Sequence, residues 1–378
     1  MATELMIERA SFMNGLGMVQ GIVERRNTVP ILGHVLLDIT RNQLELSATD
    51  LEVGIRTRLE CEAGAAGRLT LNARKLFEVV REANGDKVNL KVLENDTVEL
   101  KCGRARFKMP GLDPRSFPAM PAQNVKAEGA KLAARSELKV DSPVLAAMID
   151  RTIFAVSPDE ARYNLSGVYI ESPEPGIVRM VATDGHRLSM IDREVAGFAM
   201  SGGAIIPRKG LAELRKLLEQ AGDAAAALVI DNNLASLTRG RTEVSMRLVE
   251  GEFPDYRGVV PKESRYQITV GREELLGTIK RAAIFSNERY HGVKLGFAAG
   301  VLTISSTSPE MGEASETLDV DFNGAEFSAG FNGAYLQQVL NVLSEGNPIL
   351  GMTDEVSPGV ITCDADSRFK YVVMPMRL

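Results

Sequence analysis

The residues best suited to chemistry in this 378-residue chain form the hexapeptide TDGHRL at positions 183–188. Its Asp184 and His186 would act as a metal-binding or acid–base pair if the chain were a metal-dependent hydrolase. A zinc or catalytic centre needs more groups than these two, and no second carboxylate or histidine cluster stands nearby. The related tetrapeptide TDLE at positions 49–52 suggests that the aspartate instead serves a turn or a binding surface. These residues alone leave all three interpretations open.

Other catalytic and cofactor-binding patterns are absent from the sequence. It contains no G-x-x-x-x-G-K-[ST] or G-x-G-x-x-G phosphate loop and no G-x-S-x-G nucleophile elbow. Its three cysteines, Cys61, Cys102 and Cys363, form no C-x-x-C pair, and the chain has only three histidines. This pattern predicts neither a disulfide framework nor a structural zinc site, and it fits a reducing compartment. We therefore expect no cofactor, no metal and no enzymatic activity.

Composition places the chain among globular proteins. Hydrophobic residues make up 44% and charged residues 25%, which excludes disordered, collagen-like and coiled-coil chains. No apolar run approaches the roughly 20 residues that span a bilayer, and the N-terminus lacks a secretory signal pattern, so we expect a cytoplasmic protein. The net charge of −6 argues against a uniformly basic nucleic-acid binder. It allows basic residues that are gathered on one surface.

The elements that would position these residues repeat three times, with a period of about 125 residues. Three predicted strands end on a threonine and carry apolar or small residues one, three and five positions earlier, as expected for a strand with one buried face. A glycine 16, 16 and 15 residues before each threonine opens another strand. The threonines are Thr49, Thr183 and Thr307, and the glycines are Gly33, Gly167 and Gly292.

Each repeat also contains two predicted helices and a closing strand. Apolar residues three and four positions apart define one face of each helix. The first helices carry Phe12, Leu16, Val19, Ile22 and Val23, then Leu145, Met148, Ile149 and Ile153, then Leu275, Leu276, Ile279 and Ala283. The second helices begin about 25 residues after each threonine. The closing strands are expected at residues 105–109, 243–248 and 371–376.

The prediction is therefore an α+β chain of three like domains, each with two helices packed on mostly antiparallel strands. We place the domains at residues 1–126, 127–261 and 262–378, with linkers near 118–131 and 259–264. Lysine and arginine recur at non-core helix positions, which indicates either solvated faces or one continuous basic surface facing a phosphate backbone. The apolar C-terminal tail, residues 374–378, either packs in the core or forms a docking surface. Because it ends the chain, we expect its removal to cost the fold little.

Five separated motifs, spread in order over the whole chain, give it a resemblance to a known family. They are TVPIL at 28–32, VATDGHRL at 181–188, IPRKG at 206–210, EFPDY at 252–256 and YVVMPMRL at 371–378. Together with the threefold repeat they resemble the bacterial DNA polymerase III β subunit, the sliding clamp. The resemblance implies three tandem DNA-clamp domains per subunit and a head-to-tail homodimer that forms a six-domain ring. Helices would line the hole and sheets would form the outer wall.

The resemblance also implies three sets of site residues. A cleft that binds short linear motifs of the replicative polymerase, the clamp loader and repair proteins would use Leu165, Thr183, Gly185, His186, Arg187, Leu188, Pro254, Val259, Asn332, Tyr335, Val356, Val372, Met374, Pro375, Met376, Arg377 and Leu378. Double-stranded DNA, bound without sequence preference, would contact Arg26, Arg74, Arg81, Tyr163, Arg208, Lys209, Arg215, Lys216, Lys280 and Arg281. The dimer interface would use Lys75, Arg104, Arg106, Phe107, Ile284, Phe285, Glu310 and Glu313, with Glu316 beside them.

Gly258 departs from the family pattern, in which a long basic side chain is often found, so one contact at the rim of the cleft is in doubt. In the acidic interface segment, residues 310–316, the glutamates are interspersed with Met311, Gly312 and Ser315. We therefore expect fewer ion pairs there than in some relatives. Two alternatives to a DNA clamp stand beside it. One is the hydrolase based on Asp184 and His186, and the other is a repeat-domain scaffold with no role on DNA.

Overall fold

A computed structural model of the chain describes residues 4–23, 28–121, 136–159, 161–219, 225–231, 233–287 and 290–378. The chain divides into two compact units, which are described separately. Unit 1 comprises Met1–Ala146 and Lys209–Leu248, and unit 2 comprises Ala147–Arg208 and Val249–Leu378. The second predicted repeat contributes strands to both units. The domain boundaries proposed from the sequence stay predictions.

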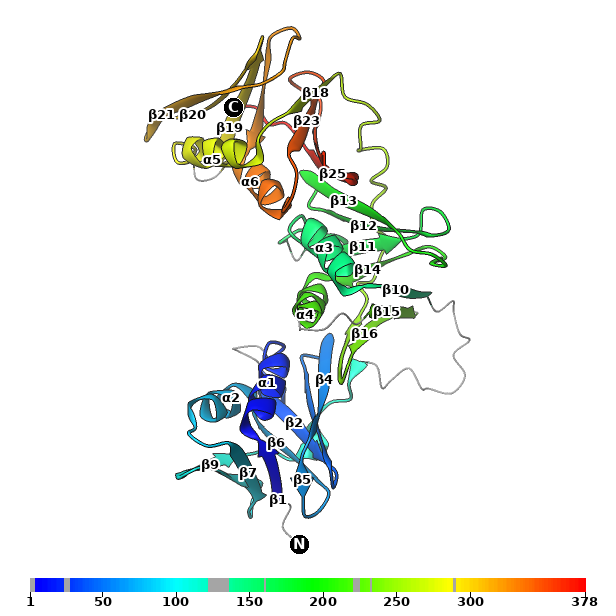
Figure 1. Cartoon of the computed structure of the whole chain (residues 1–378), viewed down its shortest axis with the longest axis vertical. Helices are drawn as coiled ribbons and strands as arrows, with labels where there is room; N and C mark the ends of the chain where they lie inside the picture. The colour runs from blue at the N-terminus through cyan, green and yellow to red at the C-terminus, as the bar shows by residue number, and fades with distance from the viewer. Residues whose placement is uncertain are drawn as a thin grey trace. The chain divides into compact units, whose positions relative to one another are not determined.

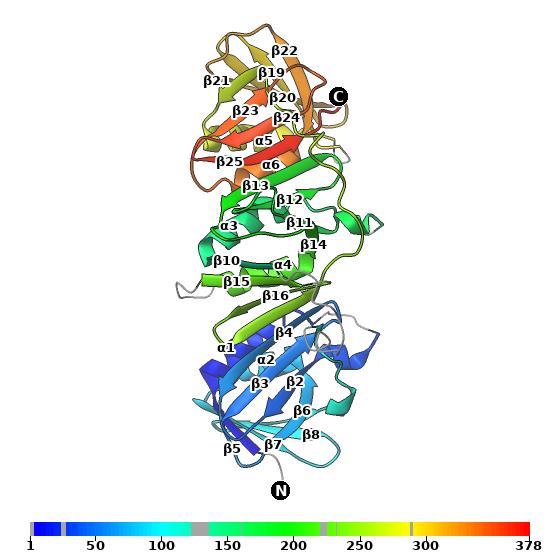
Figure 2. The same ribbon diagram turned by 90° about the vertical axis from the view of Figure 1, so that its right-hand side faces the viewer.

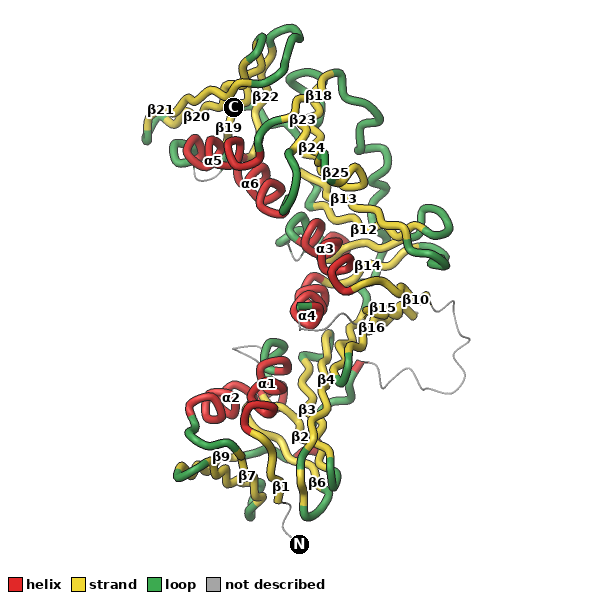
Figure 3. Tube along the Cα trace, in the orientation of Figure 1, coloured by secondary structure: helices red, strands yellow, loops and turns green. Residues whose placement is uncertain are grey.

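Each repeat supplies the two helices expected from its apolar spacing (Figure 3). The first helices of the repeats are α1 (Arg9–Val19), α3 (Ser142–Ile153) and α5 (Arg272–Ala283), and the second helices are α2 (Ala73–Glu82), α4 (Arg208–Leu218) and α6 (Gly333–Val342). One expectation was wrong: α1 ends at Val19, so Ile22 and Val23 follow the helix, although both are buried. No helix of the described residues is long and apolar enough to cross a membrane.

Unit 1 contains an eight-stranded and a five-stranded antiparallel sheet among its described residues (Figure 2). The larger sheet has the order β10 (Ser136–Asp141), β15 (Ala225–Asp231), β16 (Leu234–Arg239), β17 (Thr242–Arg247), β4 (Val53–Glu60), β3 (Gln43–Thr49), β2 (His34–Ile39), β6 (Gly67–Asn72). The smaller has the order β5 (Glu62–Ala63), β1 (Glu4–Glu8), β7 (Lys87–Val92), β8 (Thr97–Cys102), β9 (Ala105–Pro110). Helix α1 packs on β3 and β4 and lies beside α2 (Figure 1).

Unit 2 follows the same plan, with an eight-stranded and a four-stranded sheet in the part of it that the structure describes. The larger has the order β14 (Gly203–Pro207), β11 (Gly167–Glu171), β12 (Ile177–Thr183), β13 (Arg187–Glu194), β25 (Asp366–Val373), β24 (Gly359–Cys363), β23 (Pro348–Met352), β18 (Tyr266–Thr269). The smaller has the order β21 (Gly312–Asp319), β20 (Val301–Ser308), β19 (Gly292–Ala298), β22 (Phe327–Asn332). Helix α5 packs on β20 and β21 beside α6. The closing strand of the third repeat begins and ends earlier than predicted, at Asp366 and Val373, and Pro375 beyond it has no N–H for a ladder.

Both larger sheets run from one repeat into the next through the same kind of joint. In unit 1, Gly54 of β4 pairs with Thr49 on one side and with Ser245 of β17 on the other. In unit 2, Leu188 of β13 pairs with Thr183 and with Val372 of β25. The first and third repeats also leave one comparable strand each at a sheet edge, namely β9 and β21.

Candidate functional site

The aspartates of the two TD motifs hold the turns that follow β12 and β3. The Asp184 carboxylate accepts hydrogen bonds from the amides of His186 (2.9 Å) and Arg187 (3.1 Å), and the Thr183 hydroxyl donates to the Arg187 carbonyl (2.6 Å). Asp50 and Thr49 make the same bonds in the first repeat. The residue after each aspartate has positive φ, 89° at Gly185 and 83° at Leu51. Asp184 therefore serves the turn, as one of the sequence interpretations proposed.

Arg187 is a buried guanidinium whose groups are all occupied. Its Nε pairs with Asp184 Oδ2 at 3.0 Å, Nη1 donates to Gln338 Oε1 at 2.5 Å, and Nη2 donates to the Phe154 carbonyl at 2.6 Å. The guanidinium also lies 4.2 Å from the centre of the Tyr335 ring. Buried charges persist when they are paired and hydrogen-bonded in this way. Arg187 joins the β12–β13 turn to α6 and leaves Asp184 without a catalytic arrangement.

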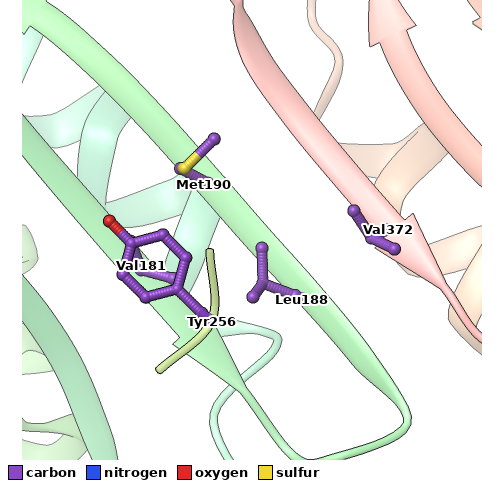
Figure 4. Packing of buried hydrophobic residues seen from close by; sticks show 5 residues of the cluster. All are labelled: Val181, Leu188, Met190, Tyr256 and Val372. Carbon is purple, nitrogen blue, oxygen red and sulfur yellow. The ribbon is translucent and has the colours of Figure 1, made fainter. Parts of the chain in front are cut away.

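Next to this turn lies an apolar cavity of about 250 Å³. Its floor belongs to a cluster of Val181, Leu188, Met190, Tyr256 and Val372, in which Leu188 and Met190 come from β13 and Val372 from the adjacent β25 (Figure 4). The structure brings nine of the predicted cleft residues together around the cavity: Leu165, Thr183, Gly185, Arg187, Leu188, Pro254, Val259, Val372 and Met374. Asp255 and Tyr256 also line it, and sequence reasoning missed both. Both belong to the EFPDY motif, so the motif could have identified them as cleft residues.

The other predicted cleft residues do not line this cavity. They are His186, Asn332, Tyr335, Val356, Pro375, Met376, Arg377 and Leu378. Asn332 caps α6, accepting hydrogen bonds from the amides of Ala334 and Tyr335. Tyr335 packs against the Arg187 guanidinium, and Val356 is 75% exposed. Their part in a wider binding surface stays a prediction.

The C-terminal tail, residues 374–378, is held against unit 2 by backbone hydrogen bonds. The Met374 amide donates to the His186 carbonyl (2.9 Å), and the Met376 amide donates to the Gly330 carbonyl of β22 (2.8 Å). The Leu378 side chain lies so close to Gly292 and Gly330 that an added Cβ would come within 2.3 and 2.6 Å of it. Removing the tail would break both backbone hydrogen bonds and the packing of Leu378, so we expect it to cost the fold more than the sequence alone indicates.

Most predicted DNA-contacting cations are engaged within the chain. Arg26 lies outside the described residues. Five cations pair with carboxylates: Arg81 with Glu82, Lys209 with Asp50, Arg215 with Glu219, Lys216 with Glu213, and Arg281 with Glu316. Hydrogen bonding from Arg281 lowers the pKa of Glu316. Arg74 donates to the Val23 carbonyl, whereas Arg208, Lys280 and Tyr163 are exposed. The positive field of these helices is therefore weaker than their count of cations suggests.

Most of the predicted dimer residues lie on or beside β9 and β21, two of the edge strands, and Lys75 lies on α2. Arg106 and Lys101 both pair with the buried carboxylate of Glu99, and the hydrogen bond from Arg106 holds the pKa of Glu99 low. Lys75 pairs with Glu78. Phe107 of β9 is half-buried, Phe285 lies against the start of β21, and Ile284 is 62% exposed. Arg104, Glu310 and Glu313 are exposed.

Repeated α+β domains with open sheet edges and a small apolar cavity are the features of a protein built for binding and assembly. Profiles of the N-terminal, central and C-terminal domains of the DNA polymerase III beta subunit match residues 3–121, 139–255 and 257–377. The chain belongs to this family, the beta sliding clamps. Its function is that of a DNA sliding clamp, a non-catalytic subunit, and the hydrolase alternative is not supported.

Individual relatives resemble the chain over its full length. The beta sliding clamp of Caulobacter vibrioides is 34% identical over 99% of this chain and 100% of its own, and that of Escherichia coli K12 is 34% identical over 98% and 99%. A solved Pseudomonas aeruginosa sliding clamp bound to griselimycin has a TM-score of 0.91 at 34% identity, covering 100% of both chains. A Caulobacter crescentus clamp, solved with polyethylene glycol in a region assigned to beta-motif tethering, has a TM-score of 0.92 at 34% identity, covering 100% of this chain and 99% of its own.

Proposed function

We propose that two copies of this chain close head to tail into a ring that encircles double-stranded DNA without reading its sequence. The ring tethers the replicative polymerase, the clamp loader and repair proteins, in the cytoplasm, through short peptide motifs that enter the cavity of unit 2. The observation that carries this proposal is the pair of free sheet edges, β9 and β21, which correspond to strands that are joined twice within the chain.

The joint of unit 1 gives the register of the proposed interface, because its closing strand, β17, pairs with β16 without a register shift, whereas β25 of unit 2 pairs with β24 across a shift. In both joints the residue opposite the threonine that recurs in each repeat pairs with a residue of the closing strand; this residue is Gly54 in unit 1 and Leu188 in unit 2. In the third repeat that position is Glu313, which pairs with Thr307 on β20. Its partner in the closing strand of the first repeat follows from the hairpins. Ser245 is the third residue after Thr242, where β17 begins, and the third residue after Ala105, where β9 begins, is Lys108.

This register is chemically complementary. It sets the exposed Glu313 opposite the exposed Lys108, and Ala314 opposite Phe107 on the other face of the strands. Directly opposed side chains of an antiparallel pair have Cβ atoms about 4.5–5.5 Å apart, close enough for an ion pair or an apolar contact. Ile284 and Phe285 would cover the apolar face next to Ala314. An edge strand with unpaired N–H and C=O groups is also a general template for pairing with another chain.

Cysteine cross-linking tests the interface and its register together. Glu313→Cys with Lys108→Cys should give a covalent dimer under mild oxidation, and the native cysteines should not interfere because all three are buried. Asp319→Cys with Lys108→Cys is the matched control, since Asp319 lies six residues further along β21, about 20 Å away. A covalent dimer from the first pair only supports the ring. Equal cross-linking of both pairs, or of neither, would refute this register.

The cavity has the character expected of a peptide-anchor site. It is apolar, lies beside a rigid turn, and is lined by residues from β12, β13, β25 and the segment 254–259. Apolar anchors of a peptide would be buried there, and each good anchor contributes about 1.5–3 kcal/mol when fully covered. DNA contacts would be few and directed at phosphates, since most of the basic side chains already have carboxylate partners. Retention on DNA would then come from ring closure and not from tight binding.

A further inference from the structure

One wall of the cavity has no secondary structure of its own. Residues 252–259 lead away from β17 as turns and irregular chain, yet Pro254, Asp255, Tyr256 and Val259 of this segment line the cavity. Irregular segments are usually the most mobile parts of a fold because few backbone hydrogen bonds hold them. A binding wall made of such a segment therefore needs side-chain contacts to fix its position.

A buried polar network supplies those contacts beneath the wall. The Tyr256 hydroxyl donates to Glu171 Oε1 on β11, and Arg257 Nη2 donates to Glu171 Oε2 at 2.7 Å. Arg179 of β12 donates from Nη1 to the Tyr256 hydroxyl at 3.2 Å, while its Nε and Nη2 bind Asp192 at 2.7 Å each. Tyr256 is 4% and Glu171 5% exposed, so the hydrogen bond between them is shielded from water, whereas the Arg257 side chain is largely exposed.

Aromatic packing and backbone bonds complete the attachment. The Phe253 ring stacks on Tyr169 of β11, with centroids 4.8 Å apart and planes 6° apart. Asn164 donates to the Glu252 carbonyl at 3.0 Å, and the Val259 amide donates to the Tyr256 carbonyl at 3.0 Å. The last bond matters most for the cavity, because it ties the exposed wall residue Val259 to the anchored Tyr256.

We propose that Glu171, acting through Tyr256 and Arg257, is the positioning residue that holds residues 252–259 in their peptide-binding geometry. Glu171 does not line the cavity, so its effect on binding is indirect. Its carboxylate accepts hydrogen bonds from two polar side chains of the segment, Tyr256 and Arg257. A hydrogen bond to a buried charged group is stronger than one between neutral groups, so this carboxylate can fix a segment that the backbone does not. The inference rests on the proposed peptide-binding function of the cavity.

The test compares Glu171→Gln, Tyr256→Phe and the double variant with the wild-type chain. Each is titrated with a fluorescent octapeptide that carries leucine and phenylalanine anchors, taken from the replicative polymerase of the same cell. Hydrogen–deuterium exchange over residues 252–260 reports the Val259 amide. Glu243→Gln is the matched control. Glu243 also accepts hydrogen bonds from an arginine, Arg56, across a sheet joint, but both residues belong to unit 1. Leu188→Ala serves as a second reference, because it removes part of the cavity floor itself.

We expect each single variant to weaken peptide binding about tenfold and to speed exchange over residues 252–260. The double variant should bind like either single variant, because both remove the same attachment. Glu243→Gln should change neither readout, even if it lowers the melting temperature. Should Leu188→Ala lose the peptide while Glu171→Gln and Tyr256→Phe bind it normally, the positioning role is wrong and the proposed function stands. If the wild-type chain itself does not bind the peptide, the proposed function and this inference both fail.

Discussion

Val259→Ala offers a direct test of the cavity as the peptide site, because Val259 lines it while remaining 39% exposed. Most of its side chain is already packed in the free protein. Truncation therefore removes some internal packing as well as the contact that an incoming peptide would make, so a thermal melt of the variant accompanies the binding measurement.

The magnitude follows from that exposed fraction. Fully burying a valine side chain contributes about 1.5–3 kcal/mol, and the peptide can cover only the remaining two-fifths, or about 0.6–1.2 kcal/mol. Since 1.4 kcal/mol is a factor of ten in affinity, peptide binding should weaken about three- to sevenfold. Fluorescence anisotropy with the labelled octapeptide measures this change.

Val29→Ala is the matched control, since Val29 is a valine of similar exposure, 46%, in the first repeat and does not line the cavity. It should leave peptide affinity unchanged. Equal weakening by both variants, or wild-type affinity in Val259→Ala with an unchanged melting temperature, would refute the placement of the peptide in this cavity.

Three further predictions concern assembly, DNA and pH. Phe285→Asp should shift the protein toward monomer in sedimentation at micromolar concentration, because an unpaired carboxylate in an apolar contact costs several kcal/mol; an unchanged dimer would exclude Phe285 from the interface. Arg208→Ala with Lys280→Ala should flatten the salt dependence of binding to open DNA by about 1.8 in log–log slope, equally for all sequences, if each residue neutralises one phosphate; a loss confined to some sequences would contradict a phosphate-facing role. Burial, with the hydrogen bond to Glu171, raises the pKa of Tyr256 to about 12. Between pH 10 and 12 the unfolded chain ionises this tyrosine and the folded chain does not, so the free energy of unfolding should fall by up to about 3 kcal/mol. Thermal melts of Tyr256→Phe should show a shallower fall, and an equal fall would place the effect elsewhere.

The sequence predicted the repeated architecture because its signals are local. Period-two strands and helix faces spaced by three and four residues need no knowledge of distant contacts. Strands β3 and β12 end at Thr49 and Thr183 as predicted, and β20 ends at Ser308, one residue beyond Thr307. The ends of the helices and strands were predicted less accurately. The apolar pattern of the first helix continues through Ile22 and Val23, but these residues are buried after the helix has ended. Apolar spacing alone cannot distinguish a buried helical turn from a buried loop.

The candidate site was predicted only in part, because its geometry depends on distant pairs. The resemblance supplied Leu188 and Val372, which are neighbours across the β13–β25 joint although 184 positions separate them in the sequence. The bond between Tyr256 and Glu171 links residues 85 positions apart, and no local pattern indicates it. Arg281 likewise pairs with Glu316, 35 positions away, so this helix residue is less available to a phosphate than the sequence indicates.

The central claim is that the chain works as a closed ring around DNA, and topology tests it most directly. The protein would be loaded by its clamp loader on a nicked circular plasmid and separated from free protein by gel filtration at a salt concentration that abolishes simple ionic binding. We predict that it stays with the circular DNA and is released when a restriction enzyme cuts that DNA once. Equal retention on circular and linear DNA, or equal loss from both, would contradict the account.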